Sequence, residues 1–306
     1  MPVSSYTHAL TDEQSIKLRE ALERDGFEFM EKPYTVYAAK KGKLNVSVYE
    51  KGPKVLVQGK ETEDFVKFTL EPEILGEAKL GYEEINDPEM FEPHFGIDES
   101  GKGDFFGPLV IAGVYTDATS TRSLMDAGIM DSKRITSTNR VRKLADVIRA
   151  TPGTFHTVVA IGPERYNELH QSFGNVNRLL AWGHARAISR LYEQQPKCPR
   201  ALSDQFASPH VLERALKSQK INIQLDQRTK AESDVAVAAA SILARERFVN
   251  WLEKTSDACG VKLPPGASDQ VIEAGRELVK RHGEGKLPLV SKTHFRTTLR
   301  ILDESG

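Results

Sequence analysis

The spacing of apolar residues changes along the chain, and this change separates two parts of different architecture. In the first part, two segments with apolar residues at helical spacing enclose three short segments in which apolar and polar residues alternate. Such alternation is typical of half-buried antiparallel strands, and glycines stand between the segments where turns are needed. The pattern predicts a small α+β domain with the order helix, three strands, helix, at residues 11–25, 34–39, 44–49, 54–58 and 61–75.

Both predicted helices of this first part carry signals for their ends and for their buried faces. Thr11, followed three residues later by Gln14, fits an N-terminal capping box. Ile16 begins a partial apolar stripe in the first helix, and Phe68 is expected to face inward in the second. Pro72 has no backbone N–H, so we expect it to end or kink the second helix.

From residue 94 onward, predicted strands and helices alternate after an initial hairpin. The strands are expected near residues 94–98, 107–115, 154–161, 200–203 and 221–225. The helices are expected near residues 163–171, 175–193, 209–218, from 231 onward, and 268–282. This order predicts an α/β domain in which a mixed sheet carries helices on its faces. We therefore expect a first domain at residues 1–85, an acidic, proline-containing linker at 86–93 and a second domain at 94–306.

Composition places the chain among ordinary globular proteins and argues against a membrane protein. Of the 306 residues, 39% are hydrophobic and 28% are charged. No apolar run approaches the roughly 20 residues that span a bilayer, and no secretory signal pattern is visible. The two cysteines, Cys198 and Cys259, are too far apart in sequence for a metal-binding motif. Reduced thiols in a cytoplasmic protein are the expected interpretation.

The net charge of −1 conceals an uneven distribution of charged residues. Residues 1–90 carry 12 Lys and Arg against 18 Asp and Glu, whereas residues 91–306 carry 30 against 25. Seven lysines nevertheless fall within residues 32–60 of the acidic part. A basic patch of this kind can follow a phosphate backbone. It can equally be a solvated, lysine-rich sheet edge that discourages aggregation, and the sequence alone leaves both interpretations open.

Four carboxylates stand at the ends of apolar segments. Asp98 and Glu99 close the first strand of the second part, Asp204 follows another strand, and Glu232 lies at the start of a helix rich in alanine and valine. Acids are poor strand residues, and at a buried strand end they are costly unless a cation or hydrogen bonds compensate them. Carboxylate oxygens suit Mg²⁺ or Mn²⁺. If the four acids converge, two such ions roughly 3.5–4 Å apart could serve displacement at a phosphodiester.

Strand geometry limits this hypothesis, and other acids compete for the role. Successive side chains on a regular strand point to opposite faces, so Asp98 and Glu99 can share a site only if the strand frays or bends at Glu99. Asp104 and Asp131 are expected to serve in turns or helix caps. Asp234 lies two residues from the fourth acid and should diverge from it by about 200° on a helix.

A glycine turn and several basic residues could bind phosphate. The Gly-Lys-Gly sequence at residues 101–103 lacks the spacing of a P-loop, but its backbone N–H groups allow close approach of a sugar or phosphate. Taken alone, such a sequence is most often a simple hairpin turn, and its position beside two acids favours binding. Lys133 and Lys230 could also contact phosphate, or could be ordinary surface charges. His294 could transfer protons, although a single histidine is more often structural.

These motifs together resemble bacterial ribonuclease HIII, a type 2 ribonuclease H family. The resemblance covers most of residues 94–296, and the region before it is similar to the TATA-box-binding-protein-like domain that this family carries. The related ribonuclease HII family typically has Arg where Lys102 stands and an aspartate as its fourth acid. The motifs that carry the resemblance are Gly96-Ile-Asp-Glu-Ser-Gly-Lys-Gly-Asp-Phe-Phe-Gly-Pro108, Asp131-Ser-Lys133, Phe173-Gly-Asn-Val-Asn-Arg-Leu-Leu-Ala-Trp-Gly-His-Ala185, Asp204-Gln-Phe206 and Ala238-Ala-Ala-Ser-Ile-Leu-Ala-Arg245.

The resemblance implies a ribonuclease H-like fold and endonucleolytic cleavage of the RNA strand of RNA/DNA hybrids, which leaves 3′-hydroxyl and 5′-phosphate ends. It implies two divalent ions, Mg²⁺ or Mn²⁺, held by the four acids as the catalytic set. It also implies that the turn inspects the 2′-hydroxyl groups that distinguish RNA from DNA. The implied roles are metal binding and catalysis for Asp98, Glu99, Asp204 and Glu232, and substrate binding for Ser100, Gly101, Lys102, Gly103 and Lys133.

Under this interpretation the lysines of the first domain grip the hybrid without sequence preference. We expect Lys40, Lys41, Lys43 and Lys54 to contribute, and we expect a monomer. Two alternatives remain at this point: a ribonuclease HII-like enzyme that incises single ribonucleotides in duplex DNA, and a non-catalytic hybrid-binding protein on the same fold. The second alternative would require the loss of a metal-binding acid, and all four are present.

Overall fold

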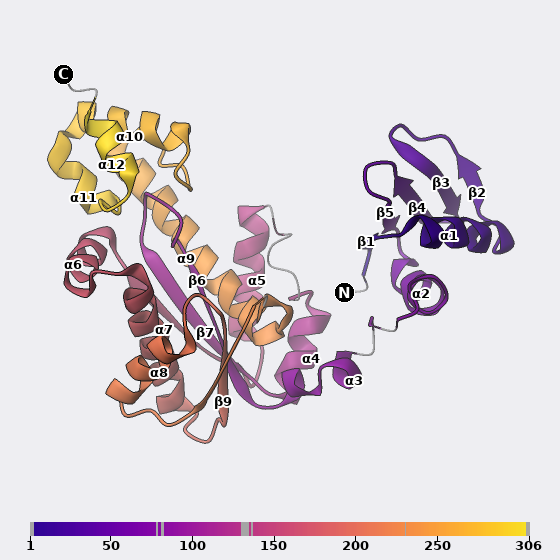
Figure 1. The fold of residues 1–306 in the computed structure, drawn as a ribbon, viewed down its shortest axis with the longest axis horizontal. Coiled ribbons are helices and arrows are strands. Elements are labelled where there is room, and N and C mark those ends of the chain that lie inside the picture. The colour runs from indigo at the N-terminus through magenta and orange to yellow at the C-terminus, as the bar shows by residue number, and fades with distance from the viewer. Residues whose placement is uncertain are drawn as a thin grey trace. The chain divides into compact units, whose positions relative to one another are not determined.

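The chain folds into two compact units, Met1–Glu89 and Met90–Gly306. The computed structural model describes residues 3–77, 79–80, 83–129, 135, 137–229 and 231–303. The expected fold class is confirmed, because each unit combines a five-stranded sheet with helices (Figure 1). No helix in the described residues is long and apolar enough to span a bilayer.

The sheet of the first unit is antiparallel and has the strand order β1-β5-β4-β3-β2. Three of its strands were predicted. The two edge strands were not, because one is only three residues long and the other alternates polar residues with few apolar ones. The strands are β1 (Ser5–Ala9), β2 (Glu28–Met30), β3 (Thr35–Lys41), β4 (Leu44–Tyr49) and β5 (Lys54–Gln58).

The helices α1 (Asp12–Arg24), α2 (Thr62–Phe65) and the π-helix η1 (Val66–Leu75) complete this unit. The capping box of Thr11 and Gln14 is confirmed. Ile16 and Phe68, however, are 62% and 64% exposed, so their predicted inward orientation is wrong. Pro72 lies inside η1 and does not end it. In α1, Ile16 lies two residues before buried Leu18 and therefore on the opposite side of the helix. In η1, the wider π-helical winding rotates Phe68 away from helical spacing and accommodates Pro72, which has no N–H.

The sheet of the second unit is mixed and has the strand order β10-β9-β6-β7-β8. The β6–β7 and β7–β8 pairs are antiparallel, whereas β6–β9 and β9–β10 are parallel. A parallel pair needs a long crossover connection, which the helices between β8 and β9 provide. The strands are β6 (His94–Ser100), β7 (Leu109–Thr116), β8 (Phe155–Ile161), β9 (Arg200–Asp204) and β10 (Gln224–Arg228).

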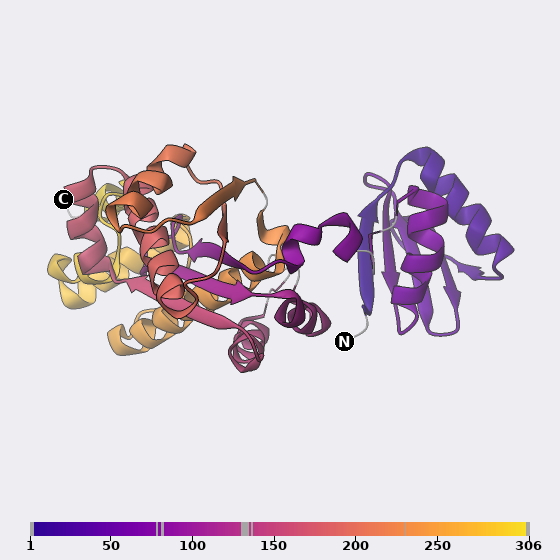
Figure 2. The same ribbon diagram turned by 90° about the horizontal axis from the view of Figure 1, so that it is seen from below.

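Helices cover both faces of this sheet (Figure 2). One face packs on α6 (Pro163–Phe173), α7 (Val176–Gln194) and α8 (Pro209–Ser218). The other packs on α4 (Ala118–Asp126), α5 (Thr138–Ala150) and α9 (Val235–Cys259). The remaining helices are α3 (Glu83–Asn86), η2 (Pro88–Phe91), η4 (Ala231–Ser233), α10 (Asp269–His282), η5 (Glu284–Lys286), α11 (Leu287–Val290) and α12 (Arg296–Leu302).

Close contact between β6 and α9 explains the small residues of that helix. A Cβ atom at Gly96 would lie 2.2 Å from the backbone of Ala236 and Val237. The helix therefore lies directly on the strand, without side chains between them at this point. Because β6 ends in two of the predicted acids and α9 follows a third, this contact determines how the two elements present those acids.

Candidate active site

The carboxyl ends of β6 and β9 bring predicted acids to one edge of the sheet. The parallel pairing of the two strands runs through Ile97 and Ser203, so Asp98 and Asp204 occupy the next positions along them. Asp204 Oδ1 accepts a hydrogen bond from the backbone N–H of Ala231 at 3.3 Å. This bond ties the short η4 helix, which carries Glu232, to the end of β9.

Asp98 and Glu99 point to opposite faces of the sheet. The strand neither frays nor bends at Glu99, because β6 remains paired with β7 as far as Ser100 and Val110, so the condition for a shared site is not met by the backbone. The side chain of Asp98 hydrogen-bonds Ser241 on α9. Glu99 instead accepts a hydrogen bond from His184 Nε2 on α7, at 3.1 Å from its Oε2 atom.

The pKa values of Asp98 and Glu99 are shifted in opposite directions. Burial, together with the negative charge of Glu99, raises the pKa of Asp98 to about 6. Burial alone would also raise the pKa of Glu99. The hydrogen bond and charge of His184, with the charge of Lys102, outweigh burial and hold the pKa of Glu99 below its usual value. One acid is thus ionised by its protein partners, and the other lacks sufficient positive charge nearby.

The donor set fits a hard divalent cation. Asp98, Glu99, Asp204 and Glu232 are all half-buried and supply only carboxylate oxygens, the ligands that Mg²⁺ and Mn²⁺ prefer. Among the described residues, no three His, Cys, Asp or Glu side chains are grouped as a ready-made metal site. Metal binding by these acids would therefore require side-chain movement about the strand ends, and it would favour ionised Asp98.

His184 is a site residue that the sequence did not single out. It is fully buried on α7, and among the described residues its Nδ1 atom has no hydrogen-bond partner. Nε2 therefore carries the proton donated to Glu99. The ring of Phe206 lies 4.7 Å from the His184 ring, and Lys102 Nζ lies 5.9 Å from the centre of Phe206. The sequence offered one signal for this residue, because His184 is a single histidine on the otherwise apolar face of the 175–193 helix.

The Gly-Lys-Gly turn has a backbone that only glycine permits at its first position. Gly101 has a φ of +92°, and a Cβ atom there would lie 2.2 Å from the carbonyl oxygen of Pro108. Lys102 is partly exposed, with Nζ 3.9 Å from Glu99 Oε1. Nothing lies within 4 Å of the position that a Cβ atom would take at Gly103, so the turn is open on that side.

Buried Lys292 supports this turn from below. Its Nζ atom donates hydrogen bonds to the carbonyl oxygens of Asp104 and Gly107, at 2.8 and 2.7 Å. The carboxylate of Asp104 accepts a hydrogen bond from the N–H of Gly266 at 2.6 Å, so it joins two segments that are far apart in sequence. The sequence indicated residues 291–295 as a possible phosphate contact, whereas the amino group of Lys292 is instead bonded to backbone carbonyl oxygens. His294 stacks on His170, with the ring centres 4.0 Å apart.

Asp234 serves the structure of the helix. It caps α9 by accepting hydrogen bonds from the N–H groups of Ala236 and Val237, and it pairs with buried His94 at 3.0 Å. Glu232 lies in η4 and Asp234 is the N-cap of α9, so the two acids are not on one helix as the prediction assumed. Asp131, Lys133 and Lys230 lie outside the described residues.

The lysines predicted to grip substrate lie at two ends of the first sheet. Lys40, Lys41 and Lys43 flank the β3–β4 turn, whereas Lys54 pairs with Tyr49 at the far end of β4. Lys41 Nζ donates to the carbonyl oxygen of Asp25 at 2.7 Å. Asn45, the partner of Lys40, and Tyr49, the partner of Lys54, are four positions apart on β4. The lysines of the β3–β4 turn and Lys54 are therefore roughly 13 Å apart along the strand.

Comparison with known proteins identifies the family. A family model described as Ribonuclease HII matches residues 95–298, and one described as a domain of unknown function matches residues 8–79. A protein named Ribonuclease HIII from Protochlamydia amoebophila is 43% identical over 290 residues, which are 95% of this chain and 94% of that protein. The chain belongs to the ribonuclease HIII family. Ribonuclease HIII from Chlamydia trachomatis serovar L2 is 40% identical and covers 98% of both chains.

Solved structures of ribonuclease HIII proteins agree with this assignment. The structure of Bst-RNase HIII in complex with Mn²⁺ has a TM-score of 0.69 and 27% identity, and covers 99% of each chain. Aquifex aeolicus RNase H3 has a TM-score of 0.55 and 25% identity, and covers 94% of this chain and 99% of its own. As a member of the ribonuclease HIII family, the protein is a metal-dependent endoribonuclease that cleaves the RNA strand of RNA/DNA hybrids.

Proposed function

We propose that Asp98, Glu99, Asp204 and Glu232 are the catalytic carboxylates of this hybrid-cleaving enzyme. The observation that carries the proposal is the register of the parallel β6–β9 pair, which places Asp98 and Asp204 side by side at one strand edge. The bond from Ala231 to Asp204 adds the segment that carries Glu232. The pKa of Asp98 is raised because two acids lie close together in a buried place, and a bound cation would lower it.

These four residues would hold two Mg²⁺ or Mn²⁺ ions, which supply an activated water and stabilise the leaving oxygen. The products are RNA ends with a 3′-hydroxyl and a 5′-phosphate. His184 keeps Glu99 ionised and fixes its orientation from the α7 face. Ser241 hydrogen-bonds Asp98 from the α9 face, which lowers the pKa of Asp98 but does not offset the effect of burial. Because β6 stays regular, Asp98 and Glu99 would share the ions only if one of the two side chains reaches around the end of the strand.

Substrate selection belongs to the turn beside the acids and to the first unit. The open side of the turn at Gly103 allows backbone groups of Ser100, Gly101 and Gly103 to approach a 2′-hydroxyl, with Lys102 near the adjacent phosphate. Lys133 is proposed as a further phosphate contact. The first unit, proposed as the hybrid-binding domain at residues 1–85, contributes Lys40, Lys41, Lys43 and Lys54, with residues 86–93 as the linker to the catalytic domain at 94–306. We also propose that the protein is a monomer in the cytoplasm, and the two buried free thiols suit that reducing compartment.

Replacing Asp98 by Asn tests the catalytic proposal. The amide keeps the shape and the bond to Ser241 but removes the charge, so we expect Mg²⁺-dependent cleavage to fall at least about 1,000-fold while hybrid affinity is retained. Cleavage of a labelled hybrid and anisotropy in EDTA measure the two quantities. Asp226→Asn is the matched control, because Asp226 lies in β10 of the same sheet and pairs with Arg200. Wild-type turnover in the Asp98 variant would refute the role.

A further inference from the structure

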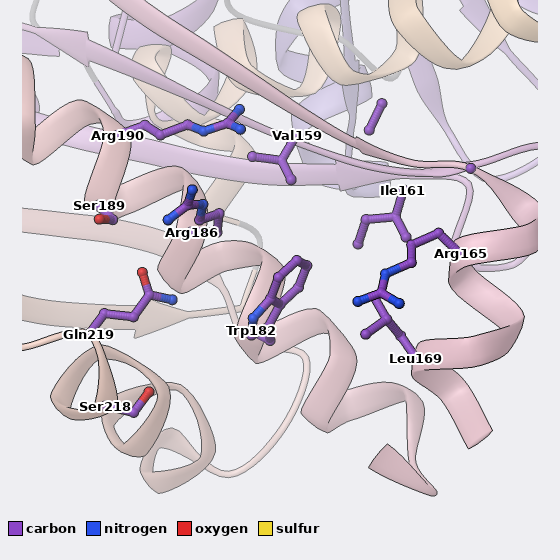
Figure 3. A pocket seen from close by; sticks show the side chains of 12 residues that line it. Val159, Ile161, Arg165, Leu169, Trp182, Arg186, Ser189, Arg190, Ser218 and Gln219 are labelled. Carbon is purple, nitrogen blue, oxygen red and sulfur yellow. The ribbon is translucent and has the colours of Figure 1, made fainter. Parts of the chain in front are cut away.

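A pocket of about 700 Å³ opens beside the edge strand β8, on the side of the sheet that α7 covers. Figure 3 shows Trp182 at its centre, with Arg165 on one side and Arg186 and Arg190 on the other. Val159 and Ile161 of β8 form part of the wall. The volume is sufficient for one or two nucleotides and falls within the usual range of small-molecule sites.

The pocket concentrates positive charge. None of the residues that line it is acidic. Arg165 forms a surface ion pair with Glu168 at 2.6 Å, with both side chains more than half exposed, so this pair competes only weakly with a ligand. Arg190 donates to the carbonyl oxygen of Val158 at 3.4 Å. Across the described residues, Arg186 has no hydrogen bond or ion pair, which leaves a complete guanidinium group for an anion.

Helical spacing aligns the indole with two of these guanidinium groups. Trp182, Arg186 and Arg190 succeed one another at intervals of four residues on α7, so they form one stripe along the helix. An aromatic face beside cations is the usual platform for an unpaired base and its phosphates. The side-chain oxygen of Gln219, also in the wall, is buried without a partner among the described residues and could accept a bond from a base amino group.

The pocket lies at the same end of the sheet as the catalytic carboxylates. Ile161 pairs with Leu109, and the adjacent Val110 pairs with Ser100, directly after Glu99. Strand β8 is two strands from β6, which corresponds to roughly 10 Å. Trp182 is also only two residues from His184, which contacts Glu99. A nucleic acid strand at the carboxylates can therefore continue into the pocket within a few nucleotides.

We propose that this arginine–tryptophan pocket binds an unpaired nucleotide of a strand that continues beyond the hybrid. A base within a duplex has both faces stacked and cannot enter a pocket, whereas a base in a single-stranded flank can. This inference rests on the proposed active site and extends it: the preferred substrate is a hybrid with a single-stranded flank on one side. The pocket supplies affinity through stacking and phosphate contacts, with little sequence preference.

Tryptophan fluorescence tests the pocket directly. The chain has two tryptophans, and Trp251 packs against the other face of the sheet, so a Trp251→Phe variant reports Trp182 alone. Titration with the single strand dT8 in EDTA should quench this signal. Adding Arg186→Ala and Arg190→Ala should weaken dT8 binding and lower the salt slope of log K by about 1.4. Arg214→Ala, a residue on α8 outside the pocket wall, is the matched control.

Binding of intact hybrids extends the test. A hybrid with a four-nucleotide dT flank should bind wild-type protein more tightly than the blunt hybrid, and this advantage should vanish only in the double arginine variant. Absence of quenching, or equal affinity for flanked and blunt hybrids, would overturn the proposal. Equal quenching by deca-glutamate would assign the pocket to acidic peptides and also overturn it. All measurements are made without metal, so failure here is distinguishable from failure of the catalytic proposal, which Asp98→Asn tests by cleavage.

Discussion

At the scale of single residues, the sequence predicted the carboxylates at strand ends, but it did not predict the residues that hydrogen-bond them or support the neighbouring turn. Asp98 and Asp204 stand out because acids are rare at the ends of buried strands. His184 and Lys292 lie 85 and 188 residues from the groups they contact, and no local pattern connects residues at such separations. The faces that Asp98 and Glu99 occupy depended on whether β6 stayed regular, which only pairing with β7 decided.

The raised pKa of Asp98 predicts that this proposed catalytic residue destabilises the metal-free protein. Between the ordinary Asp pKa near 4 and the folded value of about 6, the folded state binds more protons than the unfolded state, so stability falls as pH rises through this window. The penalty is complete above pH 6. We expect Asp98→Asn in EDTA at pH 8 to be about 1–3 kcal/mol more stable than wild type by urea denaturation.

The same comparison at pH 5 should show a smaller difference, because wild-type Asp98 is then largely protonated. Added Mg²⁺ at pH 8 should stabilise the wild type and not the variant. A stability difference that is constant from pH 5 to pH 8 would show that the carboxylate charge is not its cause.

Removing His184 should shift the pH profile of the enzyme. His184 contributes most to holding the pKa of Glu99 down, against the opposing effect of burial. In His184→Ala the pKa of Glu99 should rise, so the acid limb of the kcat/KM profile should move to higher pH. His210→Ala provides the control, because His210 is an exposed histidine that pairs with Glu213 on α8. An acid limb at unchanged pH would show that His184 does not lower the pKa of Glu99 in the enzyme.

At the scale of elements, most strands and helices with regular spacing were predicted, whereas the regular helices α4 and α5 were missed together with the irregular elements. Strands β3 to β9 and helices α6 to α10 follow the expected periodicities with small changes at their ends. The π-helix η1 escaped prediction because its winding does not follow the 3.6-residue repeat on which the prediction rests. The short helices α11 and α12 carry too few turns to show a period.

The contact of β6 with α9 predicts a severe effect of one added methyl group. Gly96→Ala would place a Cβ atom 2.2 Å from the α9 backbone, which cannot move aside as a side chain can. We expect a loss of about 1–3 kcal/mol in unfolding free energy, and reduced cleavage because the strand and helix shift apart. Gly285→Ala has open space around its Cβ position and should change neither quantity by more than about 0.5 kcal/mol in stability. Similar stability losses in both variants would contradict the packing argument.

At the scale of the whole molecule, the structure shows where the unevenly distributed charges of the first unit lie. The first unit is acidic overall, yet it presents lysines at both ends of its sheet. The sequence indicated a basic segment but not its split into two groups, because hairpin register determines which lysines are neighbours. The family comparison identified the enzyme, whereas the contribution of each lysine remains a proposal.

Charge removal at the β3–β4 turn should weaken hybrid binding in a salt-dependent way. If Lys40 and Lys43 each contact a phosphate, the double alanine variant should lower the slope of log K against log salt by about 1.8. Lys17→Ala with Lys67→Ala removes the same charge from α1 and η1 and serves as control. Lys54→Ala then reports whether the opposite end of the sheet also contacts the hybrid. An unchanged slope in the Lys40 and Lys43 variant would remove this turn from the interface.

Buried Lys292 has a consequence for the synthesis of the enzyme. The turn beside the catalytic acids is made early in translation, but the ammonium group that supports it belongs to a residue 188 positions after Asp104. A nascent chain can pair β6 with β7 on the ribosome, since those strands are local. It cannot give residues 101–107 their final support until residue 292 has emerged and docked. Incomplete chains that lack residue 292 are therefore expected to have no nuclease activity.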